Sequence, residues 1–183
     1  MLKKFTLILS LTLFGCTLST DQHQAVKGFE SEKYLGTWYE IARLDNSFEK
    51  GLNRVTATYS KREDNGIRVI NRGYEPIKKK WAEVEGKAYF IENQDTGKLK
   101  VSFFGPFYGP YTIVALDKLY YNYAMVTSGN NYLWILSRTP QLPYPIKQEL
   151  VAQAKELGFD TDKLVYVVQD APIIEYKAGP HVN

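Results

Sequence analysis

The chain has 183 residues and a formal net charge of +3, with 44% hydrophobic and 14% aromatic residues. One compact domain accounts for this length, because no internal repeat or low-complexity segment indicates a second. The small net charge, which falls further if Lys3 and Lys4 leave with an N-terminal segment, excludes the basic footprint of a nucleic-acid-binding protein.

The N-terminal segment has the pattern of a signal peptide. Two lysines precede an apolar run over Phe5–Phe14, which is too short to span a bilayer as a stable helix. Cys16, the only cysteine, follows at a position that resembles a bacterial lipobox, where cleavage precedes a diacylated cysteine. We expect a signal peptide over residues 1–15, lipid attachment at Cys16, and a lipidated tether over residues 16–30 that holds the protein on a membrane. Thr17 after the cysteine favours, by the same resemblance, the cell outer membrane; an ordinary signal peptide with an incidental cysteine is the alternative.

Beyond this segment the dominant hydrophobic period is two, which is typical of β-strands. A strand from Thr37 is followed by seven β-rich segments separated by turn residues: Arg54–Lys61, Ile67–Tyr74, Trp81–Ile91, Lys98–Phe104, Tyr111–Leu116, Tyr121–Thr127 and Tyr132–Ser137. Short hairpins between eight strands predict an all-β fold, an eight-stranded antiparallel up-and-down β-barrel that can hold one small ligand. We expect this barrel and a C-terminal helix over residues 31–176, with a tail at 177–183.

Alternation along the strands assigns side chains to the barrel interior. Small inward residues such as Ala57, Gly86 and Ala88 indicate a cavity, and a packed small barrel is the alternative. The candidate ligand-binding residues are inward-facing or near the mouth: Ala42, Val55, Ala57, Tyr59, Val69, Asn71, Ala88, Phe90, Val101, Phe103, Tyr108, Tyr111 and Trp134. The polar tips of Tyr59, Asn71 and Tyr111 could orient a headgroup or satisfy one another.

The last three strands are apolar at nearly every position, so the outer face of that part of the barrel needs a cover. Pro145 begins an amphipathic segment with its apolar residues on one stripe, and Gly158 stands where helices commonly end. We expect one C-terminal α-helix packed outside the barrel, and then a short strand over Lys163–Gln169 on its flank.

Trp38 in the first strand and Arg138 after the last predict a closed end of the barrel. A guanidinium stacks well on an indole, so we expect Arg138 to lie across Trp38 in a structural role. Glu40 falls on the inward face, where a lone carboxylate is costly to bury. Pairing with an arginine or a raised pKa is the expected explanation.

These residues resemble the signature of a known family. Gly36-x-Trp38, the segment Tyr111–Asp117 and the segment Leu133–Arg138 stand where lipocalins carry their three motifs, and the C-terminal helix completes the pattern. The chain is similar to the bacterial outer-membrane lipoprotein lipocalins, which are related to apolipoprotein D. The resemblance implies a carrier whose partner is a fatty acid or lysophospholipid, with segments 45–53 and 105–110 at the open end.

Enzymatic function is not expected. His23 and His181 are the only histidines and lie in terminal segments, and no phosphate-binding loop, dinucleotide fingerprint or metal-ligand cluster is present, so we expect no cofactor and no metal. Glu83 and Glu85 fall on the outward face, which disfavours a glycosidase pair. The alternatives are a filled barrel acting as a structural or interaction lipoprotein, and a tetrapyrrole or pigment carrier. A homodimer contact could form through exposed tyrosines: Tyr120, Tyr121 and Tyr123.

Overall fold

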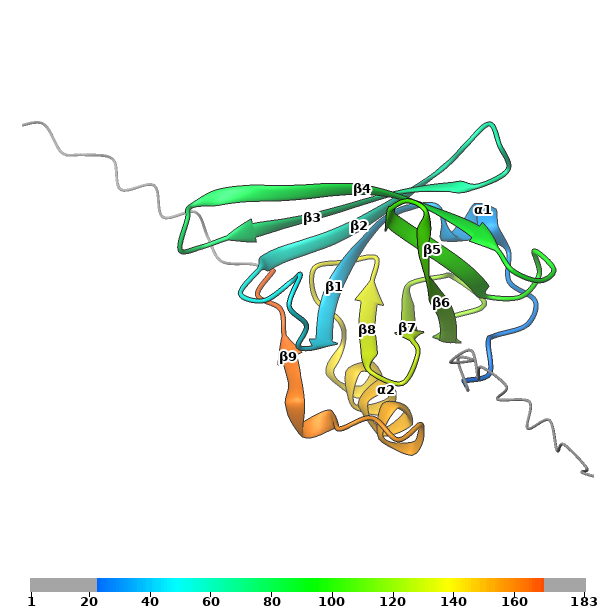
Figure 1. Ribbon diagram of the computed structural model, residues 1–183. Coiled ribbons are helices and arrows are strands. Elements are labelled where there is room, and N and C mark those ends of the chain that lie inside the picture. The colour runs from blue at the N-terminus through cyan, green and yellow to red at the C-terminus, as the bar shows by residue number, and fades with distance from the viewer. Residues whose placement is uncertain (1–22, 170–183) are drawn as a thin grey trace, which may run out of the picture.

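The computed structural model describes residues 23–169, which form a closed barrel with a helix on its outside (Figure 1). The predicted signal peptide, Cys16 and the predicted tail lie outside the described residues. The elements in chain order are α1 (Ser31–Tyr34), β1 (Gly36–Leu44), β2 (Asn53–Lys61), β3 (Ile67–Glu75), β4 (Lys80–Phe90), β5 (Lys98–Phe104), β6 (Phe107–Leu116), β7 (Tyr123–Ser128), β8 (Tyr132–Ser137), α2 (Tyr144–Glu156), a 3-10 turn (Thr161–Lys163) and β9 (Leu164–Tyr166).

Strands β2 to β8 pair in sequence order, and β1 closes the barrel by pairing with both β8 and β2. All of these pairings are antiparallel. The predicted eight-stranded up-and-down barrel is therefore confirmed. The main difference in strand bounds is that β6 begins at Phe107 instead of Tyr111.

The predicted flanking strand is β9, which pairs with the end of β1 outside the barrel. It leads to Gln169, whose side chain bridges β1 and β2 where they separate beyond Tyr39 and Thr56. The amide Nε2 of Gln169 donates to the carbonyl oxygens of Glu40 at 2.7 Å and Val55 at 2.9 Å. These bonds satisfy backbone oxygens that face no partner strand at this point.

Strand β1 serves two hydrophobic clusters because a bulge interrupts its alternation. Its register with β8 shifts between Glu40 and Ala42. Glu40 faces the interior, whereas Ile41 and Ala42 both pack in the cluster beneath α2. Arg43 then pairs with Trp134 and reaches back to Glu40. The predicted inward orientation of Ala42 is therefore wrong, since one extra residue in the strand reverses the faces beyond it.

Helix α2 covers the outer face of β1, β7 and β8, as the apolar character of the last strands predicts (Figure 1). Leu150 and Ala154 on the helix are buried against Leu133 and Ile135 of β8. Gly158 ends the helix with φ +91° and donates its N–H to the carbonyl of Lys155, a left-handed conformation that glycine adopts without strain.

Arg138 closes one end of the barrel. Its guanidinium carbon lies 3.9 Å from the centre of the Trp38 ring, which confirms the predicted stacking. The guanidinium also donates to three backbone carbonyls, at 2.6, 3.0 and 3.3 Å, which belong to Lys33, Thr37 and Tyr121. The short helix α1, which the strand pattern did not predict, brings its last residues to this end. There the carbonyl of Tyr34 accepts the indole N–H of Trp38 at 2.8 Å.

The three tyrosines suggested as a dimer contact do not share one exposed surface. Tyr121 is buried, and its hydroxyl accepts a hydrogen bond of 2.8 Å from the backbone N–H of Glu30. Tyr123 packs against the cluster beneath α2, and Tyr120 is exposed. The expectation that Tyr121 is exposed is therefore wrong.

Candidate functional site

The barrel contains a cavity of about 570 Å³. Its mouth lies at the end of the barrel opposite Arg138, where the chain connects β1 to β2, β3 to β4, β5 to β6 and β7 to β8. Phe48 and Leu52 in the first of these connections and Phe107 at the start of β6 line it, which confirms that segments 45–53 and 105–110 lie at the open end. A cavity of this size is typical of sites for small organic ligands.

Nine of the predicted ligand-binding residues come together on the wall of this cavity: Val55, Ala57, Tyr59, Val69, Asn71, Val101, Phe103, Tyr111 and Trp134. Alternation assigned all nine because each keeps the inward parity of its strand, even though the pairing register shifts beside Val55 and Phe103. Ala88 lies deeper, in a pocket of about 10 Å³ towards the closed end.

Three predicted residues do not line the cavity. Ala42 lies beneath α2, as described for the bulge in β1. Phe90 is on the inward face of β4 but packs towards the closed end, with its ring 6.1 Å from that of Phe29. Tyr108 points outside the barrel, where its ring centre lies 5.0 Å from Nζ of Lys100, because its neighbours Phe107 and Gly109 take the inward positions.

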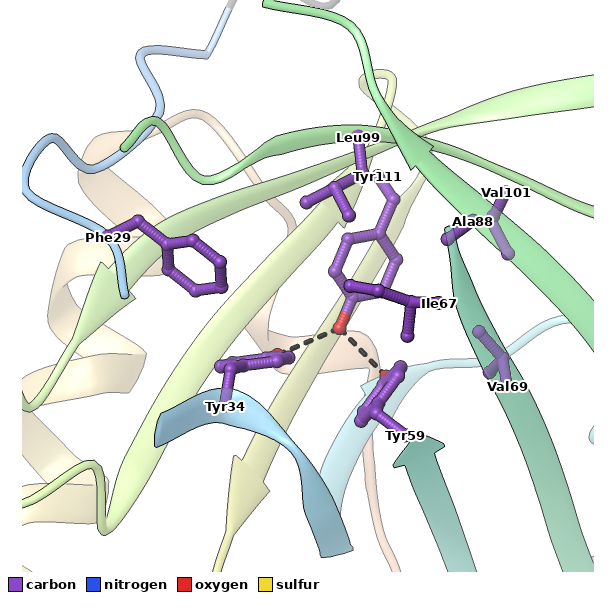
Figure 2. A pocket seen from close by; sticks show the side chains of 9 residues that line it. All are labelled: Phe29, Tyr34, Tyr59, Ile67, Val69, Ala88, Leu99, Val101 and Tyr111. Atoms are coloured by element: carbon purple, nitrogen blue, oxygen red, sulfur yellow. Dashed lines mark hydrogen bonds between the residues drawn. The ribbon is translucent and has the colours of Figure 1, made fainter. Parts of the chain in front are cut away.

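Three tyrosine hydroxyls form the base of the cavity. The hydroxyl of Tyr111 lies 2.8 Å from those of both Tyr34 and Tyr59 (Figure 2). Burial raises the pKa of Tyr59 to about 12 and the pKa values of Tyr34 and Tyr111 well above the ordinary value, so all three are neutral at physiological pH. The base is therefore uncharged, and its polar atoms already have partners.

A buried polar network forms one side of the cavity near the mouth. Arg43 donates from Nη1 to Oε1 of Glu40 and from Nη2 to the backbone carbonyl of Glu49, both at 2.7 Å. The carboxylate Oε2 of Glu49 accepts hydrogen bonds from Nδ2 of Asn46 at 2.6 Å and from Nε1 of Trp134 at 2.9 Å. Glu40 and Glu49 both line the cavity. The arginine partner expected for Glu40 is thus Arg43, three residues along the same strand.

The network contains one cation, Arg43, and two carboxyl groups, those of Glu40 and Glu49. The pKa of Glu40 is raised in this environment. Burial, and after it the negative charge of Glu49, raise the pKa of Glu40 to about 8, while Arg43 acts in the opposite direction. At neutral pH the protonated form of Glu40 is favoured, so the cavity wall carries less negative charge than its two carboxyl groups would suggest.

Comparison with known proteins gives the family. Residues 29–169 match the lipocalin-like domain family over nearly all of the barrel and helix. The chain is a lipocalin. Outer membrane lipoprotein Blc of Vibrio cholerae is 51% identical to it, over 90% of this chain and 97% of the relative. The protein of the same name in Escherichia coli strain K12 is 52% identical, over 79% of this chain and 81% of the relative. Apolipoprotein D of Rattus norvegicus is 40% identical, over 64% and 65%.

Solved structures agree with this lipocalin at the level of the fold. Apocrustacyanin C1 superposes with a TM-score of 0.64 at 23% identity, covering 78% of this chain and 81% of its own. Insecticyanin from the tobacco hornworm Manduca sexta gives a TM-score of 0.64 at 21% identity, covering 79% and 83%. At these identities the similarity concerns the barrel and its helix.

The lipocalin cavity also has two buried polar atoms without a hydrogen-bond partner among residues 23–169, Oδ1 of Asn71 and Oγ of Ser102. An unpaired buried acceptor costs about 1–3 kcal/mol, so a donor on a bound molecule would be favoured beside Asn71. Alternation predicted Asn71 on the wall but could not show that its oxygen lacks a partner.

Other lining residues of this lipocalin were not among the predicted ligand contacts. Glu49 lies in the connection from β1 to β2, where no strand period exists to assign its direction. Phe104 and Phe107 flank the turn between β5 and β6 and line the mouth. Phe107 belongs to the segment 105–110 that we expected at the open end, although it was not named as a ligand contact.

Residues 23–169 contain no cluster of three or more histidine, cysteine, aspartate or glutamate side chains arranged to hold a metal ion. No helix within this range has the length and apolar character needed to cross a membrane.

Proposed function

We propose that this lipocalin is a membrane-anchored carrier that takes the acyl chain of a fatty acid or lysophospholipid into its barrel, for lipid storage or transport in envelope maintenance. The observation that carries the proposal is the open, largely apolar cavity of about 570 Å³. Each methylene group transferred from water to such a wall contributes about 0.8 kcal/mol. An alkyl chain is therefore the ligand class that these walls favour.

The distribution of polar atoms favours entry of the acyl chain with its tail first. At the base, the hydroxyls of Tyr34, Tyr59 and Tyr111 are already hydrogen-bonded to one another. At the mouth, exposed Arg72 and the side chain of Ser128 line the cavity and could meet a phosphate or carboxylate. A headgroup at the mouth thus stays in contact with water and lies near the positive charge of Arg72.

The wall between base and mouth favours a lysophospholipid over a fatty acid. A fatty-acid carboxylate drawn deep into the barrel would approach the carboxyl groups of Glu40 and Glu49, and the negative charge of Glu49 would repel it. A lysophospholipid places its charged phosphate farther from the acyl carbons, and its glycerol hydroxyl can donate to Oδ1 of Asn71. We therefore expect tighter binding of the lysophospholipid.

The anchor forms part of the same proposal. Relatives about half identical over most of the chain are named outer membrane lipoproteins, which supports the same location here. We propose that residues 1–15 are removed as a signal peptide, that Cys16 carries the lipid, and that residues 16–30 connect it to the barrel. A Cys16→Ser variant should then leave the membrane fraction, and its continued sedimentation with membranes would refute the lipid anchor.

Tryptophan fluorescence tests the cargo directly. The mature chain from Thr17, without its lipid, keeps every helix and strand of the structure. In a Trp81→Phe background, which removes the exposed indole, titration with lysophospholipid or fatty acid should change the emission of Trp134 saturably at low micromolar concentration. The same titration after Trp134→Phe should give little signal, because Trp38 lies below the base. If direct binding with radiolabelled acyl ligands also shows no saturation, the structural or interaction role replaces the carrier.

A further inference from the structure

The turn between β3 and β4 exposes an apolar side chain beside three consecutive lysines. Ile77 is 94% exposed, and Lys78, Lys79 and Lys80 follow it directly. Trp81, the next residue, is 44% exposed. The hairpin turn extends beyond the neighbouring strands at the left of Figure 1, and its exposed side chains stand at this tip.

The lysines of this tip differ from two lysines at the closed end of the barrel. There Lys61 and Lys98 form ion pairs with Glu32 and Glu92, both at 2.8 Å. On the hairpin, Lys78 is paired with Glu75 at 2.7 Å, whereas Lys79 and Lys80 form no ion pair with any residue from 23 to 169. The tip therefore presents positive charge that the described part of the protein does not neutralise.

The base of the hairpin is braced by aromatic and cationic side chains. The rings of Tyr74 and Trp81 meet edge to face with centres 5.4 Å apart. The guanidinium of Arg72 lies 4.2 Å from the centre of the Trp81 ring, and that of Arg54 lies 5.6 Å from the centre of the Tyr74 ring. An indole and a phenol in contact beside basic groups match the chemistry of a membrane interface, where amphipathic rings and cations gather.

The other connections at this end also expose apolar side chains. Phe48, Phe104 and Phe107 are 61%, 78% and 79% exposed, and all three line the mouth of the cavity. These side chains stand on separate loops, and Ile77 stands on a third. A fluid lipid surface can accept several separate tips at once, whereas a protein partner would need a matched hollow for each.

We propose that the open end of the barrel docks onto a lipid surface with anionic headgroups. Ile77 and the rim phenylalanines enter the apolar boundary of the lipid, and Lys78, Lys79 and Lys80 lie among the headgroups. The first described residues of the chain lie at the opposite side of the molecule from the hairpin (Figure 1). Docking is thus a second membrane contact, separate from any lipid on the N-terminus, and it does not depend on which ligand occupies the cavity.

Vesicle binding by the mature chain without its lipid tests this docking. The probes are vesicles of phosphatidylcholine alone and of phosphatidylcholine mixed with phosphatidylglycerol. We expect co-sedimentation with the anionic vesicles, a blue shift of Trp81 emission, and loss of binding at high salt. Each lysine contributes about fivefold, so K78Q/K79Q/K80Q should lower the partition constant by about a hundredfold. Ile77→Asp should lower it by about tenfold, because it replaces an apolar side chain at the lipid boundary with a carboxylate.

A matched variant at the closed end provides the control. Lys118→Gln with Leu119→Asp makes the same kinds of change, at one lysine and one apolar residue, on the exposed loop between β6 and β7, and it should leave vesicle binding unchanged. All the altered side chains are exposed, and titration with acyl ligand verifies that each variant keeps its cavity. Equal binding to neutral and anionic vesicles, or equal losses in hairpin and closed-end variants, would overturn the proposal. Failure of the acyl titration alone would refute the carrier but not the docking.

Discussion

The indole Nε1 of Trp134 donates a hydrogen bond of 2.9 Å to the carboxylate of Glu49, which lies 85 residues earlier in the chain. This bond joins strand β8 to the connection between β1 and β2 at the cavity wall. Arg43 and Asn46 hold the same glutamate by its backbone carbonyl and its side chain. The position of a loop at the mouth is therefore set by contacts inside the barrel.

Removing the donor in this bond should loosen the loop. Trp134→Phe keeps an aromatic ring but leaves the Glu49 carboxylate with fewer partners, and hydrogen bonds to charged groups contribute about 1.5–3 kcal/mol. We expect a loss of about 1–3 kcal/mol in the free energy of unfolding and faster amide hydrogen exchange over residues 46–52. Trp81→Phe, at an exposed position, serves as the control. Unchanged exchange over residues 46–52 would show that the indole does not hold the loop.

The stability of the protein should fall as the pH rises from about 4.5 to 8. Glu40 has a pKa of about 8 in the folded state against an ordinary value of 4.5, so the folded protein binds more protons than the unfolded chain between these values. The contribution of protonated Glu40 to the free energy of unfolding is fully present below pH 4.5 and is lost as the pH rises through 8. The free energy of unfolding measured with urea should be lower at pH 8.5 than at pH 5 by roughly 1–4 kcal/mol. Glu40→Gln should flatten this dependence, and an equal slope in the variant would assign it to other groups.

Replacement by leucine should affect ligand binding at one alanine and stability at another. Ala57 lines the open cavity, and Ala42 is buried in the packed cluster beneath α2. Ala57→Leu should weaken acyl-ligand binding by about tenfold or more without loss of stability, because it fills empty space. Ala42→Leu should cost about 1–3 kcal/mol by overpacking and leave the binding constant unchanged in the folded protein. Thermal unfolding and ligand titration of both variants measure the difference, and a reversed pattern would contradict the assignment of Ala57 in β2 to the cavity and of Ala42 in β1 to the cluster beneath α2.

The stacked pair at the closed end should matter for stability and not for binding. Arg138→Lys keeps the charge but loses the planar group that covers Trp38 and bonds three carbonyls. We expect a loss of about 1–3 kcal/mol in urea unfolding with an unchanged ligand dissociation constant. Arg68→Lys, on an exposed arginine paired with Glu85, should change stability by less than about 0.5 kcal/mol. Weaker ligand binding in the first variant would place Arg138 in the ligand site.

The barrel could be predicted because alternation is a local property of each strand. Val55, Ala57 and Tyr59 needed only their own neighbours to be assigned to the interior. Ala42 could not be placed in this way, since the bulge before it depends on how β1 pairs with β8. A single extra residue reverses every side chain that follows.

The polar part of the site was less accessible to sequence reasoning. Glu40 was identified because a carboxyl group on an inward face is costly, and its partner Arg43 became its neighbour only through the same bulge. Glu49 stands in a loop, where direction is decided by contacts with Asn46 and Trp134 from different parts of the fold. Hydrogen bonds between distant segments leave no periodic trace in the sequence.

The three tyrosine hydroxyls below the cavity have a consequence for the movement of a ligand. They are bonded to one another, so the base offers an incoming molecule a fixed, neutral stop and no polar partner. The length of acyl chain that fits is limited by the depth from this stop to the rim, and methylene groups beyond that length remain in water. For an acyl ligand, the polar group is then the last part to enter the barrel and the first to leave it.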